Sequence, residues 1–332
     1  MRSVVLLSVL ALLLGLGRPV AAAEPSTATS SVDHILLWGR DIDQSTAIMA
    51  VKLGFQVRPG RNPGGVANRY IRFADRSFIE LLGITRKDPE FDPGMQADQA
   101  ALKGGPGART FGLSSTTLDQ VRTLLQQRGL APTPIFSASP TDPDGQGPGK
   151  PPRWRLFAFE HQPLSSNLFF IDYATGNTSP TYLADDKVIR EHPNGAKELS
   201  AVWLLSADTE ADRKQFEHMG YAGAKPVRIA QVSAHGYVVP VGKKHVFLLQ
   251  PDGPGIAADA LQRGGPQVLA VSIGVTDVDR AKRWAERGYE QELPAYCGSL
   301  GRAFLAPAQD DLGLLVEFHA LSTSAACPAK GG

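Results

Sequence analysis

Short apolar runs separated by polar turns give the chain a recurring pattern of predicted strands and helices. The first run, residues 32–38, is typical of a strand, and Asp41 can cap the helix that follows it. Gly54 ends this helix, because glycine readily adopts the left-handed conformation found at helix termini. Further strand-like runs follow, the last of them at residues 78–82. The predicted order is strand, helix and three strands.

The same order is repeated along the rest of the chain. Three further units start at the strand-like runs 109–113, 200–205 and 268–275. A glycine followed by an aromatic residue marks the predicted helix end again at Gly220 and Gly288. Self-similarity of this kind indicates an internal repeat of four strand–helix–three-strand units.

The organisation into domains follows from the spacing of these units. The polar, turn-rich stretch 187–197 lies between the second and third units and predicts an interdomain linker. We therefore expect two domains, residues 32–186 and 198–322. The 332 residues, 42% of them apolar, suffice for two cores. The glycine-rich segment 104–107 follows no phosphate-loop pattern and is interpreted as a plain loop.

The charge and the N-terminus bear on partners and location. A formal charge of +1 argues against nucleic acid as a partner. Residues 1–23 resemble a secretory signal peptide, with basic Arg2, an apolar stretch at 4–16 and small residues at Ala21 and Ala23. That stretch is shorter than the roughly 20 residues needed to span a bilayer. We expect a secreted or periplasmic protein that has no membrane association after cleavage.

Whether the two cysteines form a disulfide depends on the expected location of the protein. Cys297 and Cys327 are too few for a zinc-finger framework or a disulfide-dense small fold. In an oxidising compartment they could form a disulfide, although two free thiols remain the alternative, since the sequence does not give their separation.

The first unit carries motifs of a known family. The run 32–37 (VDHILL), the run 67–73 (ANRYIRF) and the run 78–82 (FIELL) resemble the glyoxalase-like branch of the vicinal oxygen chelate superfamily. The resemblance implies an α+β fold of four βαβββ modules, paired into two cupped mixed β-sheet domains. Members of the superfamily hold a divalent metal inside the cup and isomerise, cleave or oxidise substrates with adjacent oxygens. Other members only sequester ligands.

The resemblance also implies a metal site. His34 and Glu80 match the ligand positions of the family, Asp172 falls at the second carboxylate position, and Thr110 stands where the second module often has histidine. Imidazole and carboxylate groups suit Zn, Ni, Mn or Fe. A buried histidine bonded to a backbone carbonyl is the alternative for His34. Glu80 faces away from its two apolar neighbours on a strand, and a carboxylate inside a cup needs a metal or a base beside it.

Other residues near the expected cup are candidates for substrate binding. Arg69, Arg72 and Arg109, together with Thr110, could hold a carboxylate or phenolate, and a solvated strand face is the alternative for the arginines. His161 follows a strand at a hairpin tip, where it could serve as a metal ligand or a base, or simply face solvent.

The second domain lacks the histidines of the first. The corresponding positions fall near Val202 and Ala270, and only Glu317 remains at a carboxylate position. This argues against a ring-cleaving dioxygenase, since two-domain enzymes of that kind keep iron in the second domain. Glu317 and His319 share a strand face, and a structural ion pair is favoured over an acid–base pair. We expect a degenerate copy.

Taken together, these residues favour an exported metal-dependent lyase or isomerase. A divalent ion would act as a Lewis acid on a small molecule, while Glu80 or Asp172 moves a proton. The alternative is a resistance-type protein that sequesters a ligand without chemistry. Both functions have a small molecule as partner, and both are compatible with a homodimer.

Overall fold

The computed structural model describes residues 30–61, 63–91, 95–139, 149–174, 180–307 and 312–321, and Cys327. The predicted signal peptide, residues 1–23, lies outside the described residues. In the described part of the chain, no helix has the length and apolar character that crossing a membrane requires.

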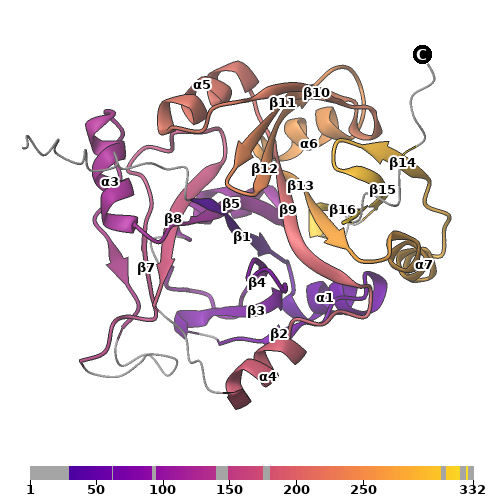
Figure 1. Cartoon of the computed structure of the whole chain (residues 1–332), viewed down its shortest axis with the longest axis horizontal. Helices are drawn as coiled ribbons and strands as arrows, with labels where there is room; N and C mark the ends of the chain where they lie inside the picture. Colours follow the sequence, from indigo (N-terminus) through magenta and orange to yellow (C-terminus); the bar gives the residue numbers. More distant parts are fainter. Residues whose placement is uncertain are drawn as a thin grey trace, which may run out of the picture.

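Four βαβββ modules follow one another, as the repeat predicted (Figure 1). The first contains β1 (Ser31–Trp38), α1 (Ile42–Ala47), β2 (Arg58–Pro59), β3 (Val66–Arg72) and β4 (Phe78–Ile84). The second contains β5 (Gly107–Ser114), α3 (Leu118–Gln127), β6 (Phe136–Ser137), β7 (Trp154–Phe157) and β8 (Asn167–Tyr173). The third contains β9 (Ala196–Leu205), α5 (Thr209–Met219), β10 (Lys225–Ile229), β11 (Ala234–Val241) and β12 (Lys244–Pro251). The fourth contains β13 (Gln267–Val275), α7 (Val278–Tyr289), β14 (Ala295–Gly298), β15 (Gly301–Ala306) and β16 (Leu315–Ala320).

Short helices connect or extend these modules. They are the π-helix η2 (Ile48–Lys52) after α1, the 3₁₀ helices η3 (Pro63–Gly65), η4 (Leu102–Gly104) and η5 (Ala230–Val232), and the α-helices α2 (Gln96–Ala101), α4 (Pro180–Val188) and α6 (Ile256–Gly264).

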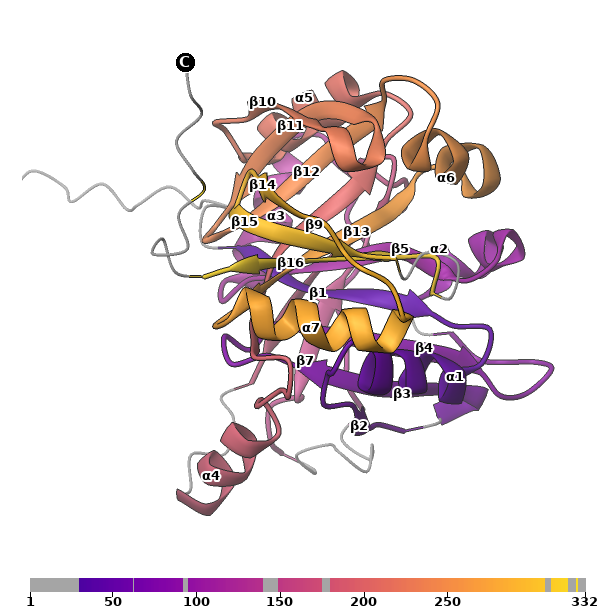
Figure 2. The ribbon, with the colours of Figure 1, turned by 90° about the vertical axis from the view of Figure 1, so that its right-hand side faces the viewer.

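The strands of all four modules form one mixed sheet. In each module the first strand pairs in parallel with the last, as β1 does with β4 and β13 with β16. The first strands of successive modules pair antiparallel, β1 with β5 and β9 with β13. Pairing of Ala108 on β5 with Val268 on β13 joins the N-terminal half of the sheet (β1–β8) to the C-terminal half (β9–β16). In Figure 2, β10–β12 lie at the top of the view and β2–β4 at the bottom, with β13, β5 and β1 between them. The predicted α+β fold class is confirmed.

Aspartates begin three of the helices, as the sequence suggested for the first. Asp41 accepts hydrogen bonds from the backbone of α1, and Asp208 and Asp277 do the same for α5 and α7. Gly220 ends α5 in the left-handed conformation. Gly288 differs from the prediction, because α7 runs past it to Tyr289. A Cβ atom at Gly288 would lie 2.5 Å from the backbone of Lys52, so this glycine allows α7 to approach η2 closely.

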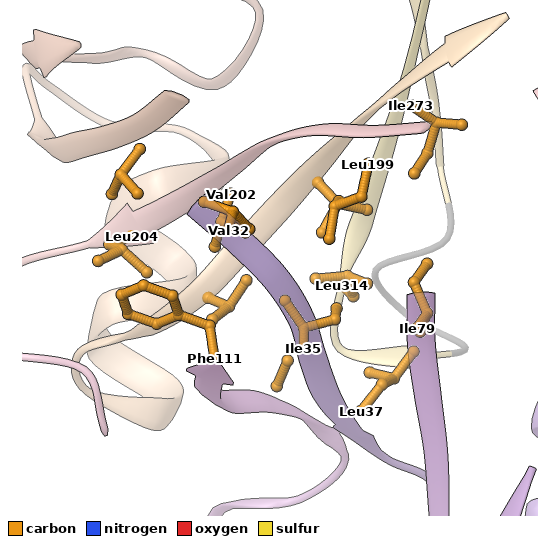
Figure 3. Packing of buried hydrophobic residues seen from close by; sticks show 14 of the residues in the cluster. Val32, Ile35, Leu37, Ile79, Phe111, Leu199, Val202, Leu204, Ile273 and Leu314 are labelled. Carbon is orange, nitrogen blue, oxygen red and sulfur yellow. The ribbon is translucent and has the colours of Figure 1, made fainter. Parts of the chain in front are cut away.

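One hydrophobic core lies between the two halves of the sheet. Ile35 and Leu37 on β1 belong to the same buried cluster as Leu204 on β9 and Ile273 on β13 (Figure 3). The other face of β1 carries His34, Leu36 and Trp38, which are also buried. Strand β1 is therefore buried on both faces, which explains its nearly continuous apolar sequence. We call the His34 side of β1, β3, β4, β5 and β8 the cup face.

The predicted linker packs tightly against the first module. Strand β9 already begins at Ala196, and within residues 187–197 Asn194 donates to the Leu53 carbonyl at 2.8 Å. The ring of His192 accepts a hydrogen bond from the Gln56 amide at Nδ1 and lies 3.0 Å from the Arg72 carbonyl at Nε2. The segment is thus part of the packed structure.

Protonation of His192 should destabilise the fold at acidic pH. Burial lowers the pKa of His192 to about 4, whereas an unfolded histidine titrates near 6.5. The contribution of neutral His192 to the unfolding free energy is therefore complete above pH 6.5 and is lost as the pH falls towards 4. At the lower pH, Nδ1 gains a proton and no longer accepts the hydrogen bond from Gln56. Between pH 7 and 4.5 the native protein should lose about 2–3 kcal/mol more unfolding free energy than a His192→Gln variant. Urea titrations at both pH values measure this difference, and equal losses would contradict the prediction.

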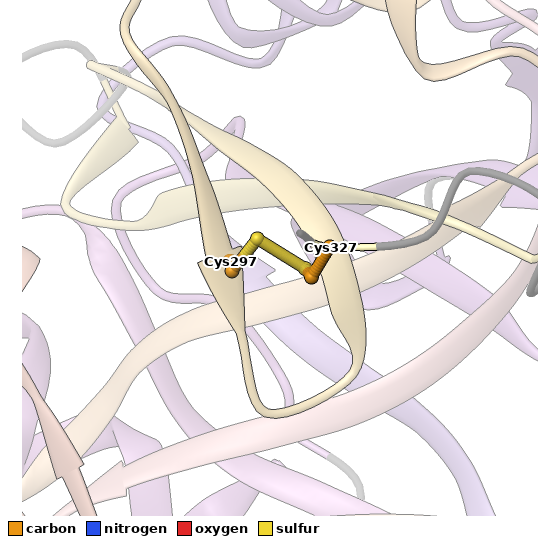
Figure 4. The surroundings of a disulfide bond; sticks show 2 residues. All are labelled: Cys297 and Cys327. Carbon is orange, nitrogen blue, oxygen red and sulfur yellow. A yellow bond between two sulfur atoms is a disulfide. The ribbon is translucent and has the colours of Figure 1, made fainter. Parts of the chain in front are cut away.

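The two cysteines are joined. Cys297 on β14 forms a disulfide with Cys327, with their Cα atoms 5.7 Å apart (Figure 4). The alternative of two free thiols does not hold in this structure.

Loss of the disulfide should lower stability. The bond closes a loop with a sequence separation of 30 residues, which restricts the unfolded chain. Reduction, or Cys297→Ser, should lower the free energy of unfolding by about 2–4 kcal/mol. Denaturant titration with and without a phosphine reductant measures the effect, with Cys297→Ser as the control that reductant leaves unchanged. An unaltered midpoint for the reduced native protein would refute the prediction.

Candidate functional site

A β-bulge brings two adjacent side chains of β1 together. The pairing with β5 shifts between Val32 and His34, so that Asp33 is the extra residue on β1. Oδ1 of Asp33 lies 2.6 Å from Nδ1 of His34, and both side chains are buried. The carboxylate therefore orients the imidazole so that Nε2 points along the cup face, towards Glu80.

Aromatic rings hold the imidazole in place. The His34 ring stacks on Phe78 with the centroids 4.1 Å apart, and the edge contact with Phe169 has a centroid distance of 5.1 Å. Gly112 lies opposite His34 on β5, and a Cβ atom there would come within 2.7 Å of the Phe169 ring. The absence of a side chain at Gly112 thus makes room for both rings.

Glu80 lies on β4 and faces His34. Its Oε2 atom is 3.9 Å from Nε2 of His34, and only 7% of the residue is exposed. The Asn68 amide donates to Oε1 of Glu80 at 3.0 Å and to the Tyr70 hydroxyl oxygen at 2.7 Å. Burial and the Glu80 carboxylate hold the pKa of Tyr70 well above its usual value. The Tyr70 phenol therefore remains protonated beside the carboxylate.

A second tyrosine completes this buried polar line. The Tyr173 hydroxyl donates to Oδ1 of Asp33 at 2.8 Å, while part of the residue is exposed. Burial of the hydroxyl and the Asp33 carboxylate raise the pKa of Tyr173. The line runs through Tyr173, Asp33, His34, Glu80, Asn68 and Tyr70. We call these six residues the polar line.

Asp172 does not join His34 and Glu80. It lies between Ile171 and Tyr173 on β8 and faces the opposite side of the sheet. There it pairs with Arg155 at 2.8 Å, and Arg155 also pairs with Asp119 of α3 at 2.9 Å. The expectation that Asp172 supplies a ligand or a catalytic carboxylate at this centre therefore lacks geometric support.

The strand registers show which residues of the second module correspond to the pair. Leu36 pairs with Glu80 in the first module, and Gly112 pairs with Phe169 in the second. Helix α1 begins at Ile42 and helix α3 at Leu118, so counting back eight residues from each relates His34 to Thr110, and counting back six relates Leu36 to Gly112. Phe169 thus takes the place of a second carboxylate. Thr110 does correspond to His34, and its hydroxyl donates to Asp98 at 2.5 Å.

The predicted substrate-binding residues are spread over several surfaces. Arg72 lies on the cup face, with its guanidinium 5.0 Å from the centroid of the Tyr70 ring. Arg69 instead contacts α1, through Thr46 at 2.6 Å and through Asp43. His161 is exposed in the loop after β7. The guanidinium of Arg109 lies beside Gly104, Gly107 and Gly264. Of the four, only Arg72 lies beside the polar line.

The C-terminal half has a carboxylate at the position of Glu80 but no histidine at the position of His34. Glu317 accepts hydrogen bonds from Ser272 at 2.5 Å and from Tyr296 at 2.6 Å, and burial raises its pKa. His319 bonds to Ser200 at 2.8 Å, so Glu317 and His319 do not form the predicted ion pair with each other. The register of β13 and β16 places Ala270 where the first module has His34.

The polar line offers two donors to a metal ion. In the described residues, no group of three or more His, Cys, Asp or Glu side chains is arranged to hold one. Metal bonds of about 2.0–2.2 Å would let one ion contact both Nε2 of His34 and Oε2 of Glu80, which are 3.9 Å apart. A carboxylate on the other ring nitrogen, as Asp33 provides, is typical of ligating histidines. The residues fit a divalent ion whose remaining positions are filled by water or substrate.

Four βαβββ modules with histidine on a first strand and glutamate on a fourth define a vicinal oxygen chelate fold. The glyoxalase-like domain family matches residues 32–220, more than half of the sequence. The chain therefore belongs to the glyoxalase-like family of this superfamily.

Solved structures share the fold at low sequence identity. A mutant of 4-hydroxymandelate synthase from Streptomyces coelicolor superposes with a TM-score of 0.60 at 13% identity, over 88% of this chain and 92% of that one. A catechol 2,3-dioxygenase gives a TM-score of 0.53 at 15% identity, over 91% and 95% of the two chains. No curated protein matches the sequence.

Proposed function

We propose that the protein is a metal-dependent glyoxalase-like enzyme of the lyase or isomerase class. Its substrate is a small molecule with two adjacent oxygens, and its reaction centre is the pair His34 and Glu80. The observation that carries this proposal is the orientation of His34 by Asp33 towards a second buried donor at 3.9 Å. Burying a histidine and a carboxylate in an apolar face costs folding free energy, which indicates that the pair serves a function.

Four residues of the polar line, and two aromatic residues beside it, have direct roles in this reaction. A divalent ion between His34 and Glu80 would supply Lewis-acid polarisation of the substrate oxygens. The Glu80 carboxylate would accept the substrate proton and return it, while the hydrogen bond from Asn68 holds Oε1. The protonated Tyr70 is a hydrogen-bond donor for developing negative charge. Phe78 and Phe169 exclude water from the imidazole.

The alternative, a ligand-sequestering protein, draws on the apolar character of the cup face. One buried cluster on this face contains Leu36, Trp38, Phe169 and Ile171. In the described residues, only His34 and Glu80 are placed to bind a metal ion there, fewer than the three ligands usual in a metal site. An aromatic ligand without chemistry would suit such walls.

Metal analysis of the purified protein separates the two functions. The enzyme proposal expects one divalent ion per chain, and turnover of α-hydroxycarbonyl or α-dicarbonyl compounds that a chelator abolishes and the same ion restores. Metal-free protein that binds an aromatic compound and releases it unaltered would favour the sequestering function. Asp172→Asn is the matched control, because Asp172 is only one residue from Tyr173 but faces α3.

We also propose that the protein is exported. The signal-peptide pattern at residues 1–23 supports this, and so does the Cys297–Cys327 disulfide, since such bonds persist mainly in oxidising compartments. Intact-mass measurement of the protein recovered outside the cytoplasm should place the mature N-terminus at or near Glu24. Retention of Met1 would contradict cleavage.

A further inference from the structure

Arg109 carries a buried positive charge that lacks hydrogen-bond partners. It lies on β5 between Ala108 and Thr110, where the pairing with β1 shifts, and only 5% of the residue is exposed. Its Nε and Nη1 atoms are buried and form no hydrogen bond within the described residues. Burial lowers the pKa of Arg109, and the negative charge of Asp98 offsets only part of this effect. A buried guanidinium in this state is costly unless a ligand pairs with it.

The carboxylate of Asp98 is already engaged. It accepts hydrogen bonds from Trp38 at 2.7 Å, from Thr110 at 2.5 Å and from Asn167 at 3.0 Å. Asp98 therefore neutralises part of the charge at a distance but does not satisfy the donors of Arg109.

Glycines enclose the guanidinium. A Cβ atom at Gly107 would lie 3.0 Å from Nη1 of Arg109, and Cβ atoms at Gly104 and Gly264 would each lie 3.3 Å from Nη2. Side chains at these positions would crowd the group. The segment 104–107 is interpreted from the sequence as a plain loop, and it forms one wall of the space around the Arg109 guanidinium.

A cavity of about 240 Å³ opens beside Arg109 at the junction of the two halves of the sheet. Its walls come from the end of β1, the loop before β5, helix α6, the start of β13 and residue 313. The charged residues among them are Arg40, Arg109 and Arg263, and none of the described lining residues is acidic. Arg40 and Arg263 are exposed and form no ion pair with a described carboxylate. Gln267, held by its bond to the Ala260 carbonyl at 2.9 Å, adds a polar side chain.

We propose that this cavity is a binding site for a phosphate-type oxyanion. Three guanidinium groups, with no carboxylate among the described lining residues, match an anion of more than one charge. The planar donors of arginine suit phosphate oxygens. The cavity is large enough for inorganic phosphate or for the phosphate group of a small monoester. Because the site touches both β5 and β13, an anion bound there stabilises the junction of the two halves. The site is separate from the polar line, since none of the residues that line the cavity belongs to that line.

Calorimetric titration at constant ionic strength tests the site, with inorganic phosphate, phenyl phosphate and potassium chloride as probes. The native protein should bind phosphate saturably, with an increase in Tm, and should not respond to chloride. Comparable binding of phenyl phosphate would identify a phosphomonoester as the ligand. Binding of inorganic phosphate alone would identify the free ion. Equal responses to phosphate and chloride would overturn the proposal.

Variants locate the binding. Arg109→Met should abolish phosphate binding and should be at least as stable as the native protein in phosphate-free buffer, because it removes an unpaired buried charge. A purely structural arginine would give the opposite change in Tm. Arg263→Glu, at an exposed position that the fold tolerates, should weaken binding at least tenfold. Arg280→Ala, at an exposed position on α7, is the matched control and should bind normally. Unchanged affinity in Arg263→Glu would exclude the cavity as the site.

Discussion

Replacing His34 by alanine should remove the divalent ion and the turnover together. Neither His34 nor Glu80 alone can retain a labile ion, because the donor set has two members. Glu80→Gln should therefore have the same effect as His34→Ala. The double variant should be no worse than either single one, since the ion is lost at the first substitution. Metal per chain, measured by mass spectrometry alongside turnover, checks all three variants.

Two carboxylate variants control this experiment. Asp172→Asn should keep the ion, because Asp172 pairs with Arg155 on the other side of the sheet. Glu317→Gln should also keep it, since Ser272 and Tyr296 already bond this carboxyl group and Ala270 stands at the corresponding histidine position. Full metal content in His34→Ala, or metal loss confined to Glu317→Gln, would mean that the reaction centre lies elsewhere.

Substitution of Asp33 by asparagine should weaken metal binding without unfolding the chain. The carboxylate orients the His34 ring, and loss of such a partner typically costs about 10–100-fold in metal affinity or activity. Asp33 is in this sense a positioning residue. Metal affinity of the Asp33→Asn variant, measured by competition with a chromophoric chelator, should fall by that factor.

Partial rescue distinguishes positioning from simple structural damage. Asp33→Glu, which keeps the charge, should recover part of the affinity, and Tyr173→Phe, which removes one donor to Asp33, should lose less than Asp33→Asn. Native affinity in Asp33→Asn, or equal losses in all three variants at unchanged Tm, would refute the role.

The fold and the central pair could be predicted because they depend on short-range patterns. Alternation along strands and glycine at helix ends indicate the modules, and the spacing of His34 and Glu80 matches two strands that pair in parallel. Asp33 was missed because strict alternation points it away from His34, and only the bulge turns it back. A bulge depends on the pairing of two strands distant in sequence, and no local pattern reveals it.

Asp172 was misplaced for a related reason. A shift of an odd number of residues along a strand moves a side chain to the other face. The register of β5 and β8 places Phe169 at the relevant position, three residues from Asp172. The sequence motif contained Tyr173, which does reach the site, but nothing in the motif alone shows which face it occupies.

The shared core of the two halves has a consequence for how the chain can diverge. After a duplication, a copy that has lost its chemistry is usually free to accumulate changes or to be deleted. Here Leu204 and Ile273, from the half with no histidine at the His34 position, belong to the same buried cluster as Ile35, one residue from His34. Deleting the C-terminal half would expose the opposite face of β1, the strand that carries the proposed reaction centre. Selection can therefore relax on the Glu317 side of the C-terminal sheet while it continues to act on the side that faces β1.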